Sequence, residues 1–156
     1  MICIKMTGKV QGVFPGDATT KGYEKQIAAA HIQFGYARPF DAHSGLASGG
    51  IVARPVVIRK TADASSTFLM QACFTNEVVT KVIVTFLVSS SGTLSGITSK
   101  AILTLNNAIV QIFEHQCEES GGVGTETITL TYQSMSYDWI DGKTTAANDW
   151  TGVTGV

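Results

Sequence analysis

The chain has 156 residues, of which 44% are hydrophobic and only 15% are charged, and its formal net charge is −1. A chain of this length fits one domain and buries roughly two-thirds of its unfolded surface, so it can form a core without disulfides or metal. Because Arg59-Lys60 is its longest basic cluster, the chain lacks the positive patch expected of a protein that binds nucleic acid or anionic lipid.

The N-terminal half predicts three strands. Residues 2–6 alternate between apolar and polar positions, and residues 8–22 hold the Gly and Pro residues typical of a loop. A second strand is predicted over residues 27–38 and ends at Pro39, because proline cannot donate to a ladder. Residues 56–58 predict a third strand.

A helix is predicted over about residues 64–74. Asp63 is the expected N-cap, and Asn76 is the expected stop. One face of this helix is apolar and is expected to be buried, through Phe68, Leu69, Ala72 and Cys73.

The C-terminal half predicts more strands. Residues 78–88 are apolar on both faces, and a turn is expected at residues 89–92. Two strands are predicted at 101–105 and 108–114, separated by Asn106-Asn107, and residues 118–124 are expected to form a loop.

The last predicted strand changes its buried face. Ile128, Leu130 and Tyr132 share one parity, whereas Met135 and Trp139 share the other. An extra residue near positions 133–134 would produce this change, so a β-bulge is predicted there. About seven strands and one short helix predict a mainly β fold, as a small antiparallel β-barrel or two tightly packed sheets.

Residues that could carry chemistry are few. His115 and Cys117 lie on one strand face, but two ligands are too few for a closed zinc site, so no metal and no cofactor are expected. Cys73 is expected to be buried, and Glu118-Glu119 to be solvated, and the three cysteines have no paired spacing. Since no catalytic motif occurs, the chain is not expected to be an enzyme.

Two features concern the cellular location. No apolar run approaches the roughly 20 residues that span a bilayer, so no membrane insertion is expected. Residues 1–5 lack a basic segment followed by a long apolar one, which predicts a cytoplasmic protein without a signal peptide.

Several segments carry a family resemblance. The stretch from Lys60 to Cys73, with Asp63, Leu69 and Ala72 in register, resembles the signature of the Hcp family, the hemolysin-coregulated proteins of type VI secretion systems. Residues 27–35, 126–137 and 142–150 are similar to the second strand, the last strand and the C-terminal tail of that family. The resemblance covers nearly the whole chain, as a single domain over residues 1–156.

The resemblance implies a tube subunit that closes into a hexameric ring. Such rings stack into a hollow tube inside a contractile sheath, below a VgrG-type spike, and they can carry effector proteins in the lumen. The subunit itself would perform no catalysis, and after synthesis it would be secreted through the type VI machine. The low charge of the chain agrees with a subunit whose apolar surface is covered by other chains.

The resemblance also assigns roles to residues. Residues 41–54, small and almost uncharged, correspond to the extended loop that packs on neighbouring subunits of the family. Its expected interface residues are Ala42, His43, Ser44, Gly45, Leu46, Ala47, Ser48, Gly49 and Gly50. Strand parity then places His31 and Gln33 toward the lumen, opposite Ile32 and Phe34.

Two other functions stay open. A tail-tube subunit of a phage, or of another contractile injection machine, would share the fold and the ring. A monomeric β-sandwich binding module, for example for carbohydrate, would instead expose an aromatic platform, for which Trp139 and Trp150 are the available tryptophans.

Overall fold

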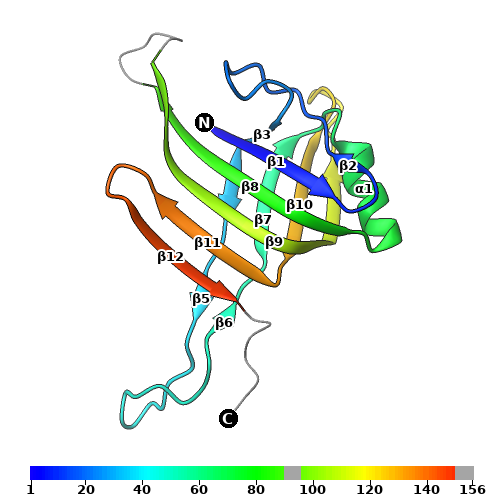
Figure 1. Ribbon diagram of the computed structural model, residues 1–156. Coiled ribbons are helices and arrows are strands. Elements are labelled where there is room, and N and C mark those ends of the chain that lie inside the picture. Colours follow the sequence, from blue (N-terminus) through cyan, green and yellow to red (C-terminus); the bar gives the residue numbers. More distant parts are fainter. Residues whose placement is uncertain (90–95, 150–156) are drawn as a thin grey trace.

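The computed structural model describes residues 1–89 and 96–149, and within them one helix accompanies antiparallel strands (Figure 1). The strands are β1 (Ile2–Gly8), β2 (Gly12–Val13), β3 (Ile27–Ala29), β4 (His31–Gln33), β5 (Tyr36–Ala37), β6 (Val52–Ala53), β7 (Val56–Thr61), β8 (Val78–Ser89), β9 (Ile97–Gln116), β10 (Thr125–Thr131), β11 (Ser134–Trp139) and β12 (Thr144–Asp149). The predicted mainly β class is confirmed. The turn expected at 89–92 lies mostly outside the described residues, as does Trp150.

The large sheet closes on itself through residues 27–33, which hold β3 and β4. Its strand order is β2-β1-β8-β9-β10-β7-β4, and β3 pairs with β1 at the opposite end from β4. Between β3 and β4, the amide of Ala30 donates to the carbonyl of Arg59 at 2.9 Å. The prediction of one strand over residues 27–38 is therefore wrong, because the chain there crosses from one sheet edge to the other and splits into β3, β4 and β5.

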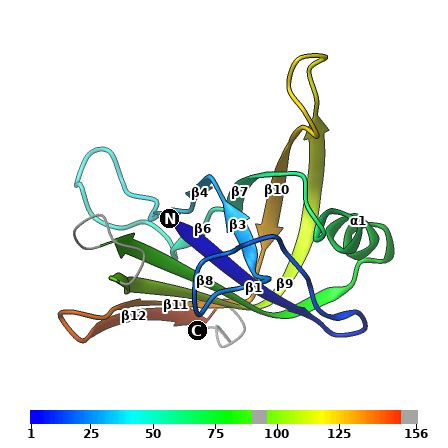
Figure 2. The same cartoon turned by 90° about the horizontal axis from the view of Figure 1, so that it is seen from above.

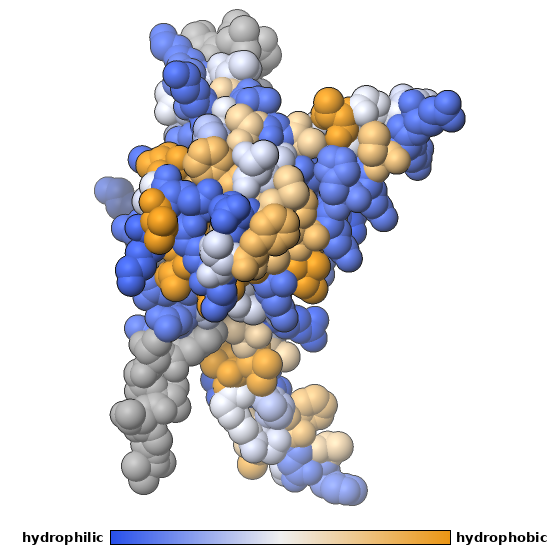
Figure 3. All heavy atoms as spheres, turned by 90° about the vertical axis from the view of Figure 1, so that its right-hand side faces the viewer, coloured by the Kyte–Doolittle hydropathy of each residue, from blue (hydrophilic) through white to orange (hydrophobic). Residues whose placement is uncertain are grey.

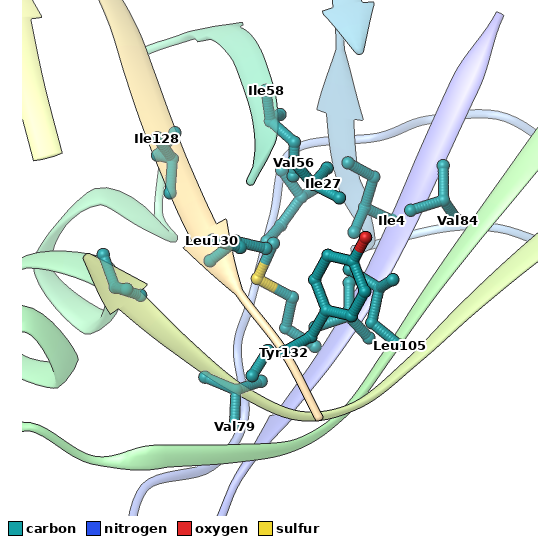
Figure 4. Packing of buried hydrophobic residues seen from close by; sticks show 14 of the residues in the cluster. Ile4, Ile27, Val56, Ile58, Val79, Val84, Leu105, Ile128, Leu130 and Tyr132 are labelled. Atoms are coloured by element: carbon teal, nitrogen blue, oxygen red, sulfur yellow. The ribbon is translucent and has the colours of Figure 1, made fainter. Parts of the chain in front are cut away.

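The interior of this barrel is filled by aliphatic side chains that alternate along the strands (Figure 4). Ile4, Ile58, Val84, Leu105 and Ile128 have no exposed surface and come from five different strands. Burying one such side chain contributes roughly 1.5–3 kcal/mol, so the alternation read in the sequence is also the main source of stability.

Three neighbouring strands change their buried face at the same level of the sheet, which we call the crease. The buried residues on its two sides are spaced by three instead of two: Val79 and Val82, Ala108 and Leu105, and Tyr132 and Met135. The positions between them are polar, and two side-chain hydrogen bonds of 2.9 Å join them, from Asn107 to Gln133 and from Asn106 to Ser134. The crease therefore runs across β8, β9 and the junction between β10 and β11.

The crease explains the predicted change of parity but corrects the predicted bulge. The chain separates there into β10 and β11, and the register shift between β10 and β9 lies between Thr129 and Leu130 instead. The two strands predicted at 101–105 and 108–114 are one strand, β9. Asn107 adopts a φ of 50° within it, a conformation that asparagine tolerates better than most residues.

The helix α1 (Ser66–Thr75) lies against β9 on the right-hand side of Figure 1. Ser65, and not Asp63, occupies the N-cap position. The carboxylate of Asp63 accepts a hydrogen bond from the Ser65 amide at 2.8 Å, just before the helix begins. Asn76 ends the helix with a φ of 53°, as predicted. Leu69 and Ala72 are buried, so the expected apolar face is confirmed at its centre.

Two hairpins extend from the barrel. The far ends of β9 and β10 form an arm that projects away from the body (Figure 2), and β11 pairs with β12 to extend the sheet on the opposite side. Residues 144–149 were not predicted as a strand, because they are mostly exposed and show no alternation of apolar and polar residues.

Candidate assembly interface

The loop between β5 and β6 is the most exposed part of the described chain. Residues 38–52 are all exposed, and the loop projects downward from the body in Figures 1 and 3. The expected interface residues 42–50 lie in it. The chain remains extended, with one isolated bridge between Phe40 and Ala47, and β6 takes up the last residues of the predicted 41–54 segment.

A short internal turn shapes the tip of this loop. The carboxylate of Asp41 accepts hydrogen bonds from the His43 amide at 3.1 Å and the Ser44 hydroxyl at 2.9 Å. The hydrogen bonds from the His43 amide and from the Ser44 hydroxyl lower the pKa of Asp41. Gly45 follows with a φ of 71°, which glycine adopts without strain. The tip is therefore held in shape by hydrogen bonds among its own residues.

The loop exposes large apolar side chains. Phe40 is 68% exposed, Leu46 is 70% exposed, and Ile51 and Val52 are exposed beside them. Single apolar residues on a surface are ordinary, whereas several on one projecting segment indicate an interaction site. The loop is therefore a candidate surface for contact with another polypeptide chain.

The expected inner-face residues lie on β4, away from the core. His31 and Gln33 are exposed, whereas Ile32 and Phe34 pack against the core, so the predicted parity is confirmed. The structure does not bring these two residues together with the loop tip, because they follow the sheet while the loop leaves it (Figure 1).

The residues considered for chemistry do not form a reactive site. Nδ1 of His115 lies 3.3 Å from the buried carboxylate of Glu126, and the thiol of Cys117 donates to the Gly122 carbonyl at 3.2 Å. Cys117 is exposed, and Cys73, which was expected to be buried, is only half-buried. Within residues 1–89 and 96–149, no group of three or more His, Cys, Asp or Glu residues could hold a metal.

A buried ionic cluster escaped the sequence analysis. Nζ of Lys60 lies 2.7 Å from Glu126 and 2.8 Å from Asp63. Lys60 and Glu126 are each 1% exposed. Glu126 lies directly opposite Lys60 on the paired strands β10 and β7. The cluster joins these strands to the loop that enters α1. Two charged residues with the parity of buried positions were the available signal.

Glu77 is a second buried anchor that the sequence did not reveal. Its carboxylate accepts the amides of Val10 and Gln11 at 2.7 and 2.8 Å and the Gln11 side-chain amide at 2.8 Å. Burial alone would raise the pKa of Glu77, but the bonds from Gln11 and Val10 outweigh burial and lower it. Glu77 thereby holds the turn after β1 against the end of α1.

Replacing Glu77 by glutamine is expected to lower the free energy of unfolding by about 1–2 kcal/mol at pH 7, because one bond and the charge are lost. Since the folded pKa is lowered, this contribution is complete above the unfolded value of about 4.5 and disappears as the pH falls further. Urea unfolding of both proteins at pH 7 and pH 3.5 measures it. A difference that is unchanged at the lower pH would contradict this role.

Two further observations concern the aromatic platform of a binding module and the spanning of a membrane. Trp139 was expected on an apolar face, but it is 45% exposed. In the described part of the chain, no helix is long and apolar enough to span a membrane.

A protein-family model matches most of the chain. The model of the family described as "Type VI secretion system effector, Hcp" matches residues 4–139. A curated relative, "Major exported protein" of Pseudomonas aeruginosa strain PAO1, is 26% identical over 160 residues, covering 94% of this chain and 93% of the relative.

Solved structures with the same fold carry the same family name. A crystal structure of an Hcp protein matches 96% of this chain and 98% of its own, with a TM-score of 0.85 and 21% identity. Hcp1 of E. coli EAEC 042 matches 96% and 97%, with a TM-score of 0.85 and 16% identity. Secreted Hcp3 of Pseudomonas aeruginosa matches 96% and 99%, with a TM-score of 0.77 and 22% identity.

Proposed function

Because this chain belongs to the Hcp family of type VI secretion system effectors, we propose that it is the structural subunit of a secretion tube. Six copies close into a ring, and rings stack into a hollow tube that a contractile sheath drives outward behind a VgrG-type spike. Effector proteins travel in the lumen, and the subunit performs no catalysis.

The observation that carries this proposal is the projecting loop with its exposed apolar side chains. Phe40, Leu46 and Val52 are each more than half exposed in the isolated subunit. Holding the loop on a partner costs about 1–2 kcal/mol per ordered residue, so stable assembly must offset this cost by burying apolar area. The loop is the surface best supplied with such area.

The shape of the subunit favours a head-to-tail contact over a two-fold one. The loop is a projecting element, and its natural complement is a recessed surface elsewhere on the same molecule. A contact between two different surfaces closes into a ring if the rotation fits, whereas a two-fold contact ends at a dimer. In this arrangement residues 42–50 lie on the neighbouring subunit, and His31 and Gln33 face the lumen.

Export follows from the same proposal. The subunit is made in the cytoplasm and leaves through the machine of which it forms the tube. The relative from Pseudomonas aeruginosa that is named for its export supports this route.

The mass of the particle in solution tests the proposal. We expect native mass spectrometry to find a species of about six times the subunit mass of 16.5 kDa. A particle that remains a monomer at high protein concentration would rule out the ring and would favour the monomeric binding module.

A further inference from the structure

Strand register extends the inner face beyond His31 and Gln33. His31 lies opposite Arg59 of β7, which lies opposite Thr127 of β10. Gln33 lies opposite Val57 in the same way. Because directly paired residues point to the same side of a sheet, β4, β7 and β10 present one continuous face, and they lie side by side in Figure 2.

A small hollow opens on this face beside Gln33. Its volume is about 150 Å³, and it is lined by Gln33, Phe34, Gly35, Arg54, Pro55 and Val57. Sites for small molecules and cofactors occupy roughly 300–1,000 Å³, so this hollow is too small for them. It is large enough for one side chain of a partner.

Two arginines lie on this face: Arg54 lines the hollow, and Arg59 follows Val57 by two residues on β7. Arg54 and Arg59 are both exposed, and in the described part of the chain no carboxylate lies within ion-pair distance of either guanidinium. Along the row that holds Arg59, the first acidic residue is Glu114 of β9, two strands away and thus about 10 Å across the sheet. Arg54 therefore lines a hollow that is partly polar and partly apolar, with Phe34, Pro55 and Val57 as its apolar wall, and Arg59 lies further along the same face.

We propose that this face binds an acidic segment of a polypeptide carried by the ring, and this location in the ring rests on the function proposed above. A carboxylate of the cargo pairs with Arg54 or Arg59, since the planar guanidinium fork matches a carboxylate in two parallel hydrogen bonds. An aliphatic side chain next to that carboxylate enters the hollow against Pro55 and Val57. Repetition around the ring multiplies a weak single contact into useful retention.

Peptide binding to the full chain tests this site. The probe is a rhodamine-labelled, unstructured twelve-residue peptide of Glu, Leu, Gly and Ser, and the matched peptide carries Gln in place of Glu. By fluorescence anisotropy we expect at least tenfold tighter binding of the Glu peptide, and we expect 0.5 M salt to weaken that preference. The Arg54→Gln/Arg59→Gln double variant should bind both peptides equally.

Glu114→Gln is the matched control, because it removes a charge from the same face at a distance from the hollow. It should keep the preference for the Glu peptide. Both arginines are exposed, so the double variant should retain the thermal midpoint of the wild type within the small range of surface substitutions.

Two results overturn the site: equal binding of both peptides by the wild type, or an unchanged preference in the double variant. Native mass spectrometry of the same samples separates this failure from that of the ring. A hexamer without the preference overturns only the binding site. A monomer that keeps the preference supports the site and contradicts the ring.

Discussion

Replacing Lys60 by methionine is expected to lower the free energy of unfolding by about 3–5 kcal/mol, because removing one partner of a buried ion pair leaves the other charge uncompensated. Here the cation serves two carboxylates, Glu126 at 2.7 Å and Asp63 at 2.8 Å, and both are shielded from water. No other described cation lies within ion-pair distance of Glu126, apart from the imidazole of His115 if it is protonated. Urea unfolding at pH 7, followed by circular dichroism, measures the loss.

The chain supplies a matched control for this variant. Lys100 pairs with Asp141 at 2.6 Å, but the two side chains are 35% and 56% exposed. Exposed pairs contribute about 0–1 kcal/mol, so Lys100→Met should unfold nearly like the wild type. Equal losses in the two variants would show that burial of the Lys60 cluster does not matter.

A double variant separates the charge from the packing. Lys60→Met combined with Glu126→Leu removes both directly paired charges on β7 and β10. Asp63 keeps its hydrogen bonds from Ser65. Since buried pairs can be exchanged for apolar residues at little cost, we expect this variant to regain part of the stability lost by Lys60→Met.

The second large effect is expected on assembly instead of folding. Gly50→Glu should abolish the ring while the barrel remains folded. In the isolated subunit, no atom lies within 4 Å of a Cβ built at Gly50, and the backbone there is not in the left-handed region, so the subunit tolerates a side chain. A carboxylate placed in an apolar contact between subunits loses its hydration, which costs several kcal/mol if it stays unpaired.

Analytical ultracentrifugation, together with a thermal melt, measures both properties of this variant. Gly50→Ala is the control, because it adds a Cβ without charge and should assemble as the wild type does. If Gly50→Glu forms hexamers of normal mass and stability, the loop is not the interface, and residues 42–50 lose the role proposed for them.

The local pattern of the sequence predicted the elements whose partners do not alter them. Residues 78–88 were recognisable because a run of apolar residues on both faces suits a strand between two others, and β8 indeed lies between β1 and β9. The helix was recognisable from its apolar spacing and from Asn76 at its end. The parity change near residue 133 was visible because burial alternates along a strand.

The features that were missed depend on residues far away in the chain. Nothing local in residues 27–38 shows that β3 and β4 pair with strands at opposite edges of the sheet. The bulge was misplaced because Asn106 and Asn107 on β9 bend together with Gln133 and Ser134, and one strand does not reveal its neighbour. The contact between Lys60 and Glu126 was missed because only the pairing of β7 with β10 brings these two residues opposite each other.

Of the candidate interface, the exposure of the loop and of His31 and Gln33 followed from the sequence. The hollow beside Gln33 did not, because Arg54 and Pro55 reach it from the connection between β6 and β7, more than twenty residues later in the chain. A pocket is a property of the topology, and the order of residues gives it only once the strand pairs are known.

The closure of the sheet limits the folding rate, because it requires contacts between residues that are far apart in the sequence. β1 can pair with β8 only once β8 is available, and the amino group of Met1 donates to the carbonyl of Leu87, 86 positions away. Small proteins dominated by such remote pairings fold in about milliseconds to seconds, far more slowly than helical bundles. During that interval the edge of β1 is uncovered, so newly made chains are most prone to aggregate before their barrel shuts.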